Sequence, residues 1–256
     1  VPISFSVSPF MVFTDGMLAW PPDPEAWSLR WYRNMIGDCS ADVVSSTVPC
    51  STKWMTGTIN SFFIGIVSTF IATSLGTLAA LGLSRPHMPY KGLIMSILIS
   101  PMIVPLIITA AGMFFFYARI NLVYTFTGVI LAHVALATPF VVITVTATLV
   151  GFDMNMVKAA QSLGAKPIRT FFKVIMPLIL PGIISGALFA FITSFDEVVI
   201  VMFMASLDQL TIPKQMWAGI RQEISPVILC MATCLVILSI FLLTTVELLR
   251  RRSEKL

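Results

Sequence analysis

Five apolar stretches, each long enough to cross a membrane as a helix, constrain the fold of this chain more than any other sequence feature. A helix needs about 20 mostly apolar residues to span the ~30 Å hydrocarbon layer of a bilayer. The stretches cover residues 57–83, 92–117, 122–150, 182–206 and 226–249. Only 11% of the 256 residues are charged, too few to cover a water-soluble domain. The sequence therefore predicts an all-α, polytopic membrane helix bundle with five full spans and excludes a water-soluble enzyme.

The residues before the first full span divide into an apolar start and a polar segment. Residues 1–13 are apolar but too short to span a bilayer, so we interpret them as the end of a truncated first span. A surface strand or an interfacial segment is the alternative. Residues 14–56 are expected to be external, and residues 57–256 to form the transmembrane core. Cys39 and Cys50 can form a disulfide if the external segment faces an oxidising compartment, which their spacing alone does not decide.

The distribution of Lys and Arg along the chain predicts its orientation. Under the five-span arrangement, one side of the membrane carries ten of these residues and the other side six. The richer side includes Arg250, Arg251 and Arg252, directly after the last span. Because cytoplasmic loops carry the excess of positive charge, the C-terminus is predicted to be cytoplasmic.

The connection between the third and fourth full spans, residues 151–181, has the pattern of two short amphipathic helices. The first is expected over residues 154–163, with Gly164 as a left-handed stop. Pro167 is favourable at the first position of a second helix, which is expected to end before Pro177. In each of the two helices, apolar residues share one face and basic residues lie on the remaining faces. The connection is therefore an elbow on the cytoplasmic surface, and its simplest alternative role is adsorption to anionic lipid.

The elbow carries a pattern that resembles a known family. The pattern runs Lys158-Ala159-Ala160, three residues, Gly164, nine residues, Val174, one residue, Met176-Pro177. It is similar to the signature loop in permease subunits of binding-protein-dependent ABC importers, which begins Glu-Ala-Ala and has Ile and Leu at the two apolar positions. Val174 and Met176 keep the apolar bulk, whereas Lys158 reverses the charge of the family's Glu.

The resemblance implies a type I ABC importer permease whose elbow docks on a cytoplasmic ATPase subunit and transmits its closure to the spans. The residues implied in ATPase coupling are Lys158, Ala159, Ala160, Ser162, Leu163, Gly164, Ala165, Arg169, Phe171, Phe172 and Pro177. The implied partners are a second homologous permease subunit, two ATPase subunits, an external substrate-binding protein and lipid of the bacterial inner membrane. The sequence has no GxxxxGKS or GxxxxGKT loop, so ATP and Mg²⁺ are expected on the separate ATPase. The chain itself is expected to be no enzyme and to bind no cofactor, metal or nucleic acid.

Three further segments resemble the spermidine/putrescine branch of these permeases. They are residues 28–32 (Ser-Leu-Arg-Trp-Tyr), 194–199 (Ser-Phe-Asp-Glu-Val-Val) and 212–217 (Ile-Pro-Lys-Gln-Met-Trp). That branch has six spans, which agrees with a truncated first span at residues 1–13. The implied function is ATP-driven import, by alternating access, of a polyamine or related small organic cation received from the binding protein.

Asp196 and Glu197 are the only acidic residues deep inside a predicted span. An unpaired carboxylate there costs at least a few kcal/mol, so each is expected to face protein, water or a partner. In one interpretation, one of them lines the substrate path and favours cations, with Tyr117 offering an aromatic face. In the other, they pair with Arg or Lys or cap the end of a broken helix. An ion-coupled secondary transporter that uses both carboxylates is the alternative function.

Basic residues on the predicted external side are candidates for docking of the binding protein. They are Arg119, Lys214 and Arg221. Exposed loop charges are usually only solvated, so this role is an open alternative to simple hydration.

Overall fold

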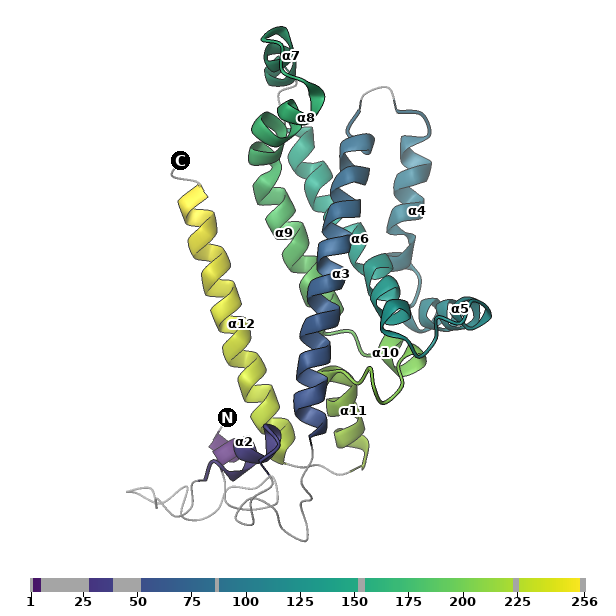
Figure 1. Cartoon of the computed structure of the whole chain (residues 1–256), viewed down its shortest axis with the longest axis vertical. Helices are drawn as coiled ribbons and strands as arrows, with labels where there is room; N and C mark the ends of the chain where they lie inside the picture. The colour runs from purple at the N-terminus through teal and green to yellow at the C-terminus, as the bar shows by residue number, and fades with distance from the viewer. Residues whose placement is uncertain are drawn as a thin grey trace. The chain divides into compact units, whose positions relative to one another are not determined.

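The computed structural model describes residues 2–5, 28–38, 52–85, 88–151, 155–222 and 226–253. Every regular element in these residues is a helix (Figure 1). The chain divides into two compact units, residues 1–61 with 210–256 and residues 62–209, and each is described by itself. Cys39 and Cys50, and with them the predicted disulfide, lie outside the described residues.

The larger unit is built around α6 (Phe126–Val150), which packs against α4, α9 and α10. α6 begins at an N-cap, where the Thr125 hydroxyl accepts a hydrogen bond of 3.0 Å from the Gly128 amide. The other elements of this unit are the part of α3 (Lys53–Leu83) that follows residue 61, α4 (Lys91–Ile103), α5 (Leu106–Arg119), α7 (Asn155–Ser162), α8 (Pro167–Thr170), the π-helical turn η3 (Phe171–Ile175), α9 (Met176–Phe195) and α10 (Val199–Met204).

Small residues on α9 bring its backbone close to α6. A Cβ atom at Gly186 would lie 3.0 Å from the Cα of Val141, and one at Gly182 would overlap the side chain of Thr148. Gly182, Gly186 and Ala190 recur every four residues and are all buried. Close backbone approach through small residues is a common way for helices to associate in lipid. Apolar side chains gain little there by moving from lipid into a contact between helices, because both surroundings are apolar.

The predicted span over residues 92–117 is not one continuous helix. It consists of α4 and α5, whose axes meet at 103° (Figure 1). The break lies at Val104, which is extended with ψ 135°, and at Pro105, the residue before α5. A residue before proline is driven out of the helical region by the prolyl ring, which explains the position of the break. The pair is a broken span or a re-entrant loop instead of the single full span that was expected.

The predicted span over residues 182–206 is wrong at both ends. α8, η3 and α9 form one apolar helical run over Pro167–Phe195, so the second elbow helix does not end before Pro177. In η3 the Met176 amide bonds to the Phe171 carbonyl, five residues back, and Pro177 follows in the first turn of α9. A missing N–H costs least in the first turn of an α-helix, so the proline is accommodated at this change of hydrogen-bond register. At the other end, α9 stops at Phe195 and α10 starts separately.

The smaller unit contains η1 (Pro2–Phe5), α2 (Arg30–Met35), the start of α3, α11 (Ile212–Gln222) and α12 (Pro226–Ser253). η1 and α2 pack against α12. The start of α3 is tied to the segment before α11, because Asn60 donates a hydrogen bond of 2.9 Å to the Leu210 carbonyl and Ser61 accepts one of 2.9 Å from the Ile212 amide.

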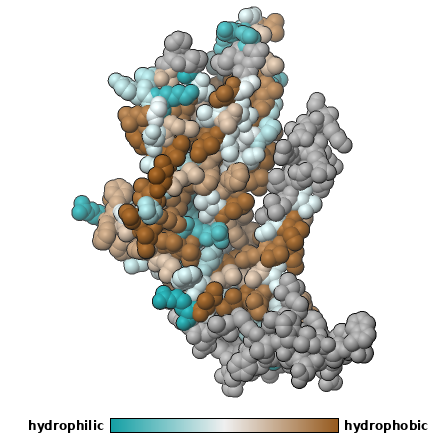
Figure 2. Space-filling model, turned by 180° about the vertical axis from the view of Figure 1, so that it is seen from behind, coloured by the Kyte–Doolittle hydropathy of each residue, from teal (hydrophilic) through white to brown (hydrophobic). Residues whose placement is uncertain are grey.

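Within the described residues, three helical segments are long and apolar enough to cross a membrane, or four if the bent α4–α5 pair is one span. The three are Lys53–Leu83, Phe126–Val150 and Pro167–Phe195, and the apolar part of α12 described with its side chains, Pro226–Phe241, is shorter. Large apolar side chains such as Phe70 and Leu78 of α3 and Phe115 of α5 are exposed. Figure 2 shows brown apolar patches among the coloured residues of the face in view, as expected for helices in contact with lipid.

Candidate functional site

The predicted elbow is present, and its turn has a defined hydrogen-bond pattern. α7 ends at Ser162, and Gly164 has φ +80°, as the predicted left-handed stop requires. The Gly164 amide donates to the Gln161 carbonyl at 2.9 Å, and the Ala165 amide donates to the Ala160 carbonyl at 3.0 Å. This pair of bonds is the Schellman motif, which satisfies carbonyls that the helix end leaves free. The glycine of the sequence pattern is therefore a conformational requirement of the turn.

The structure brings the predicted coupling residues together, because α7 packs against both α8 and η3. Most of their side chains face outward, and Leu163 is 89% exposed. Phe172 is also exposed, whereas Phe171 is half-buried with its ring centroid 5.0 Å from that of Phe172. The other exposed members are Lys158, Ala159, Ser162, Gly164, Arg169 and Pro177, and the half-buried ones are Ala160 and Ala165. An exposed apolar group of this kind, with basic residues around it, is typical of a surface that a protein partner or the membrane covers.

A single helical run connects the elbow to the acidic pair. The run Pro167–Phe195 has 29 residues, and at 1.5 Å per residue it is about 43 Å long. It starts directly after the α7–α8 turn and ends immediately before Asp196. The second half of the elbow and the helix that ends at Asp196 are therefore one continuous element.

Asp196 and Glu197 lie at a break between α9 and α10, and not within one continuous helical span as predicted. Asp196 is exposed and ends α9, where its amide donates to the Ile192 carbonyl at 3.0 Å. Glu197 is only 7% exposed, and its Oε1 accepts a hydrogen bond of 2.8 Å from the Ile200 amide in the first turn of α10. Among the described residues, no Lys or Arg forms an ion pair with either carboxylate. Glu197 thus caps a helix, which was one of the predicted alternatives, and Asp196 leaves its carboxylate accessible.

A buried histidine near this break was missed by the sequence analysis. His133 of α6 is 1% exposed and shares a hydrogen bond of 2.7 Å between its Nδ1 and the Ser194 hydroxyl of α9. Its Nε2 has no hydrogen-bond partner in the part of the chain that the structure describes. The sequence signal was a lone imidazole inside an apolar stretch, whose partner lies 61 positions away. The hydrogen bond fixes the end of α9 against α6 just before Asp196.

The remaining predicted site residues belong to different units. Tyr117 is half-buried in α5 and packs against the core of the larger unit, with Arg119 exposed at the end of the same helix. Lys214 and Arg221 lie on α11 in the smaller unit. Arg221 is exposed, whereas Lys214 is half-buried and this burial lowers the pKa of its ammonium.

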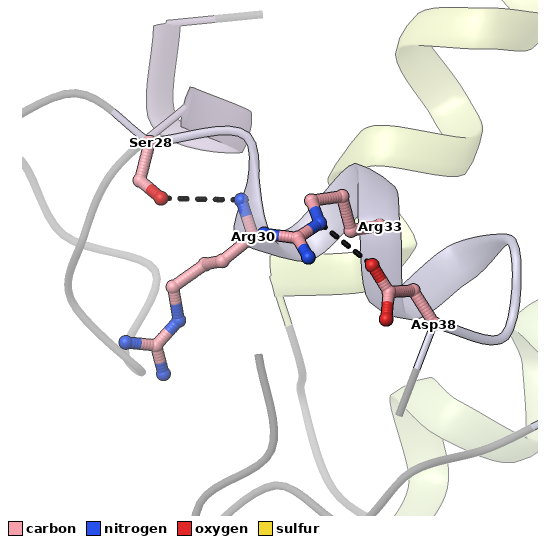
Figure 3. A network of polar contacts seen from close by, with 4 residues as sticks. All are labelled: Ser28, Arg30, Arg33 and Asp38. Carbon is pink, nitrogen blue, oxygen red and sulfur yellow. Dashed lines mark hydrogen bonds and ion pairs between the residues drawn. The ribbon is translucent and has the colours of Figure 1, made fainter. Parts of the chain in front are cut away.

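The Ser-Leu-Arg-Trp-Tyr segment has a structural explanation in the smaller unit. The Ser28 hydroxyl accepts a hydrogen bond of 3.1 Å from the Arg30 amide at the start of α2, and Arg33 forms an ion pair of 2.7 Å with Asp38 (Figure 3). Trp31 is fully buried with the Arg30 guanidinium 4.4 Å from its ring centroid. The Tyr32 hydroxyl lies 2.7 Å from that of Ser4 in η1. The motif therefore joins η1 and α2 into the cluster that packs on α12.

The chain as a whole is similar to known membrane transport proteins. Residues 55–255 match the family described as "Binding-protein-dependent transport system inner membrane component". The spermidine/putrescine transport system permease protein PotC of Haemophilus influenzae is 30% identical over 196 residues, which are 77% of this chain and 76% of that protein. The putrescine transport system permease protein PotI of Escherichia coli strain K12 is 29% identical over 215 residues, which are 81% of this chain and 72% of that protein.

A solved structure of the MetNI methionine ABC transporter, in an inward-facing conformation, has a similar fold. It matches with a TM-score of 0.62 and 19% identity and covers 78% of this chain and 95% of that chain. At this level of identity the likeness concerns the fold alone. It confirms the predicted fold class of a helical importer permease.

Proposed function

Because the chain belongs to the family of inner-membrane components of binding-protein-dependent transport systems, and is a permease of this class of ABC importer, we propose that it imports a polyamine or related organic cation. The relatives PotC and PotI are named for spermidine and putrescine transport. The proposed complex contains this chain, a second homologous permease subunit, two cytoplasmic ATPase subunits and an external substrate-binding protein. The proposed orientation places the elbow and the C-terminus in the cytoplasm.

The observation that carries the proposal is the direct continuation of the exposed elbow into the helix that ends at Asp196. An ATPase dimer that closes around two elbows can shift the spans between inward-open and outward-open states only if it binds the two states with different affinity. A continuous helical run does not bend freely between its ends. A displacement of the elbow at one end therefore also displaces the other end of the run, next to Asp196. The elbow supplies shape and an apolar anchor, and the partner ATPase supplies ATP hydrolysis with Mg²⁺.

Asp196 is proposed as the carboxylate that meets the substrate cation. Its side chain is exposed, whereas Glu197 is buried and engaged with the Ile200 amide. A protonated amine gains most from a carboxylate whose lone pairs are free, since a charge-assisted hydrogen bond is shorter and stronger than a neutral one. The aromatic ring of Tyr117 is a second candidate contact, because cations bind favourably over aromatic faces.

The test is purification of the chain with the proteins encoded beside it, in mild detergent, followed by measurement of ATP hydrolysis. The proposal predicts a stoichiometric ATPase subunit and hydrolysis that rises when binding protein loaded with spermidine or putrescine is added. An intact, folded chain that purifies without any ATPase contradicts the proposal and favours an ion-coupled transporter. Stimulation by a loaded binding protein only with a non-cationic solute contradicts the polyamine assignment alone.

A further inference from the structure

α7 presents two different faces. Its outward face consists of Asn155, Lys158, Ala159 and Ser162, which are spaced i, i+3, i+4 and i+7 and are all exposed. Val157 and Ala160 are half-buried on the opposite side, where α7 packs against α8 and η3. The outward face is therefore fixed by the packing of the elbow, and Lys158 is its only charged residue.

Among the described residues of the elbow, every charged side chain is basic. The elbow also exposes Lys166, Arg169 and Lys173, and the nearest acidic residues in the sequence are Asp153, which lies outside the described residues, and Asp196. Among the described residues, no carboxylate lies within ion-pair distance of Lys158. The Ser162 hydroxyl donates back to the Lys158 carbonyl at 3.0 Å, so it is turned toward its own helix. A partner that covers this face without a negative charge would leave the ammonium without a partner, at considerable cost.

The position of α7 favours a protein partner over the lipid surface. Lys166, Arg169 and Lys173 are exposed along the first turns of the Pro167–Phe195 run and just before it, which is where basic residues mark the membrane interface. α7 comes before these residues in the chain and projects beyond α8 at the end of the larger unit (Figure 1). The centre of its outward face is also small and polar, with Ala159 beside Lys158, and the exposed apolar Met156 lies to the side of this face. A helix that adsorbs to lipid instead turns its bulky apolar face to the membrane.

We propose that the ATPase subunit presents an Asp or Glu carboxylate that forms an ion pair with Lys158 on the outward face of α7. This inference rests on the proposed function of the elbow. A facing basic residue would repel Lys158, so the ion pair also selects which ATPase this permease accepts. Ala159 leaves room for the partner's backbone beside the pair.

The experiment treats the purified permease–ATPase complex with a carbodiimide, which joins a lysine amine to a carboxylate only when the two are in contact. Mass spectrometry is expected to find Lys158 joined to one acidic residue of the ATPase. Lys158→Arg should lose this cross-link and keep the ATPase and its stimulation, because a guanidinium forms the ion pair but is not coupled. Lys158→Glu should weaken ATPase retention by about tenfold or more. Lys173→Glu, a charge reversal off the outward face, is the matched control and should change retention much less.

Three outcomes overturn the inference. One is full retention and stimulation in Lys158→Glu. The second is an equal loss in Lys158→Glu and Lys173→Glu, which indicates a general effect of charge. The third is an effect of Lys158→Glu that occurs in phosphatidylglycerol nanodiscs and disappears in phosphatidylcholine nanodiscs, which assigns Lys158 to lipid. Failure of the wild-type chain to bind any ATPase refutes the proposed function itself, so the two failures are distinguishable.

Discussion

Substitution of Gly164 tests whether the conformation of the elbow is required for coupling. Gly164 has φ +80°, and a Cβ atom added there would meet no other atom within 4 Å. The cost of a side chain is therefore conformational and not steric contact with neighbours. An L-residue held in the left-handed region costs about 1–2 kcal/mol, with β-branched residues at the upper end.

This cost acts on a helix with little stability of its own. α7 has eight residues, and helices shorter than about 12 residues are marginal in isolation. A loss of 1–2 kcal/mol reduces the population of the formed elbow by about 5- to 30-fold relative to its unfolded alternatives. We expect Gly164→Val to leave the protein inserted and assembled in the membrane while substrate-stimulated ATP hydrolysis falls by a factor of this order.

The assay measures hydrolysis by the reconstituted complex with and without loaded binding protein. Asn tolerates the left-handed conformation, so the expected order of activity is Gly164→Asn above Gly164→Ala above Gly164→Val. Gly92→Val is the matched control, because Gly92 also has open space around it and has no positive φ. Normal stimulation in Gly164→Val, or equal damage by Asn and Val, would refute the conformational argument.

The other predictions concern the larger unit. Gly186→Leu forces a side chain into α6 and should lower the melting temperature in detergent, with a cost of about 1–3 kcal/mol, whereas Gly186→Ala should cost less. Asp196→Asn should reduce spermidine uptake without loss of assembly, and loss of assembly would instead assign a structural role. Glu197→Ala removes the α10 cap and should destabilise the protein by about 1 kcal/mol, measured by thermal unfolding. His133→Ala leaves the Ser194 hydroxyl unpaired and should cost about 1–3 kcal/mol, and a double-mutant cycle with Ser194→Ala should show coupling between the two.

The helical fold and the elbow turn were predictable because each depends on local sequence. Long apolar stretches can satisfy their backbone polar groups in lipid only as helices or closed barrels, and their length and spacing favour helices. Gly164 was predictable for the same reason, since the left-handed stop at the end of α7 is a property of a few neighbouring residues.

The effect of the prolines was not predictable from the sequence. Pro105 follows a break of 103°, whereas Pro177 and Pro181 lie within one continuous helical run. The difference depends on whether the surrounding turns can change register, as η3 does before Pro177, and on which neighbours pack against the segment. The periodicity and length of an apolar stretch do not show whether its turns can change register or which neighbours pack against it.

The surroundings of the acidic pair and of the buried histidine were also not predictable from the sequence. The two carboxylates were singled out from the sequence, but their different environments, one exposed and one buried, follow from the end of α9 at Phe195, which the apolar pattern did not reveal. The only sequence signal for His133 was a lone imidazole inside an apolar stretch, and its partner Ser194 could not be identified because it lies on another helix. Long-range contacts of this kind depend on how the helices pack.

The most direct test of the account is spermidine uptake by proteoliposomes that contain the purified complex, with loaded binding protein on the external side and no ion gradient. For an ATP-driven importer with a coupling elbow, we expect uptake that requires ATP on the ATPase side, continues in the presence of ionophores and falls with Gly164→Val. Uptake driven by a proton or sodium gradient without ATP would contradict it and would establish an ion-coupled transporter.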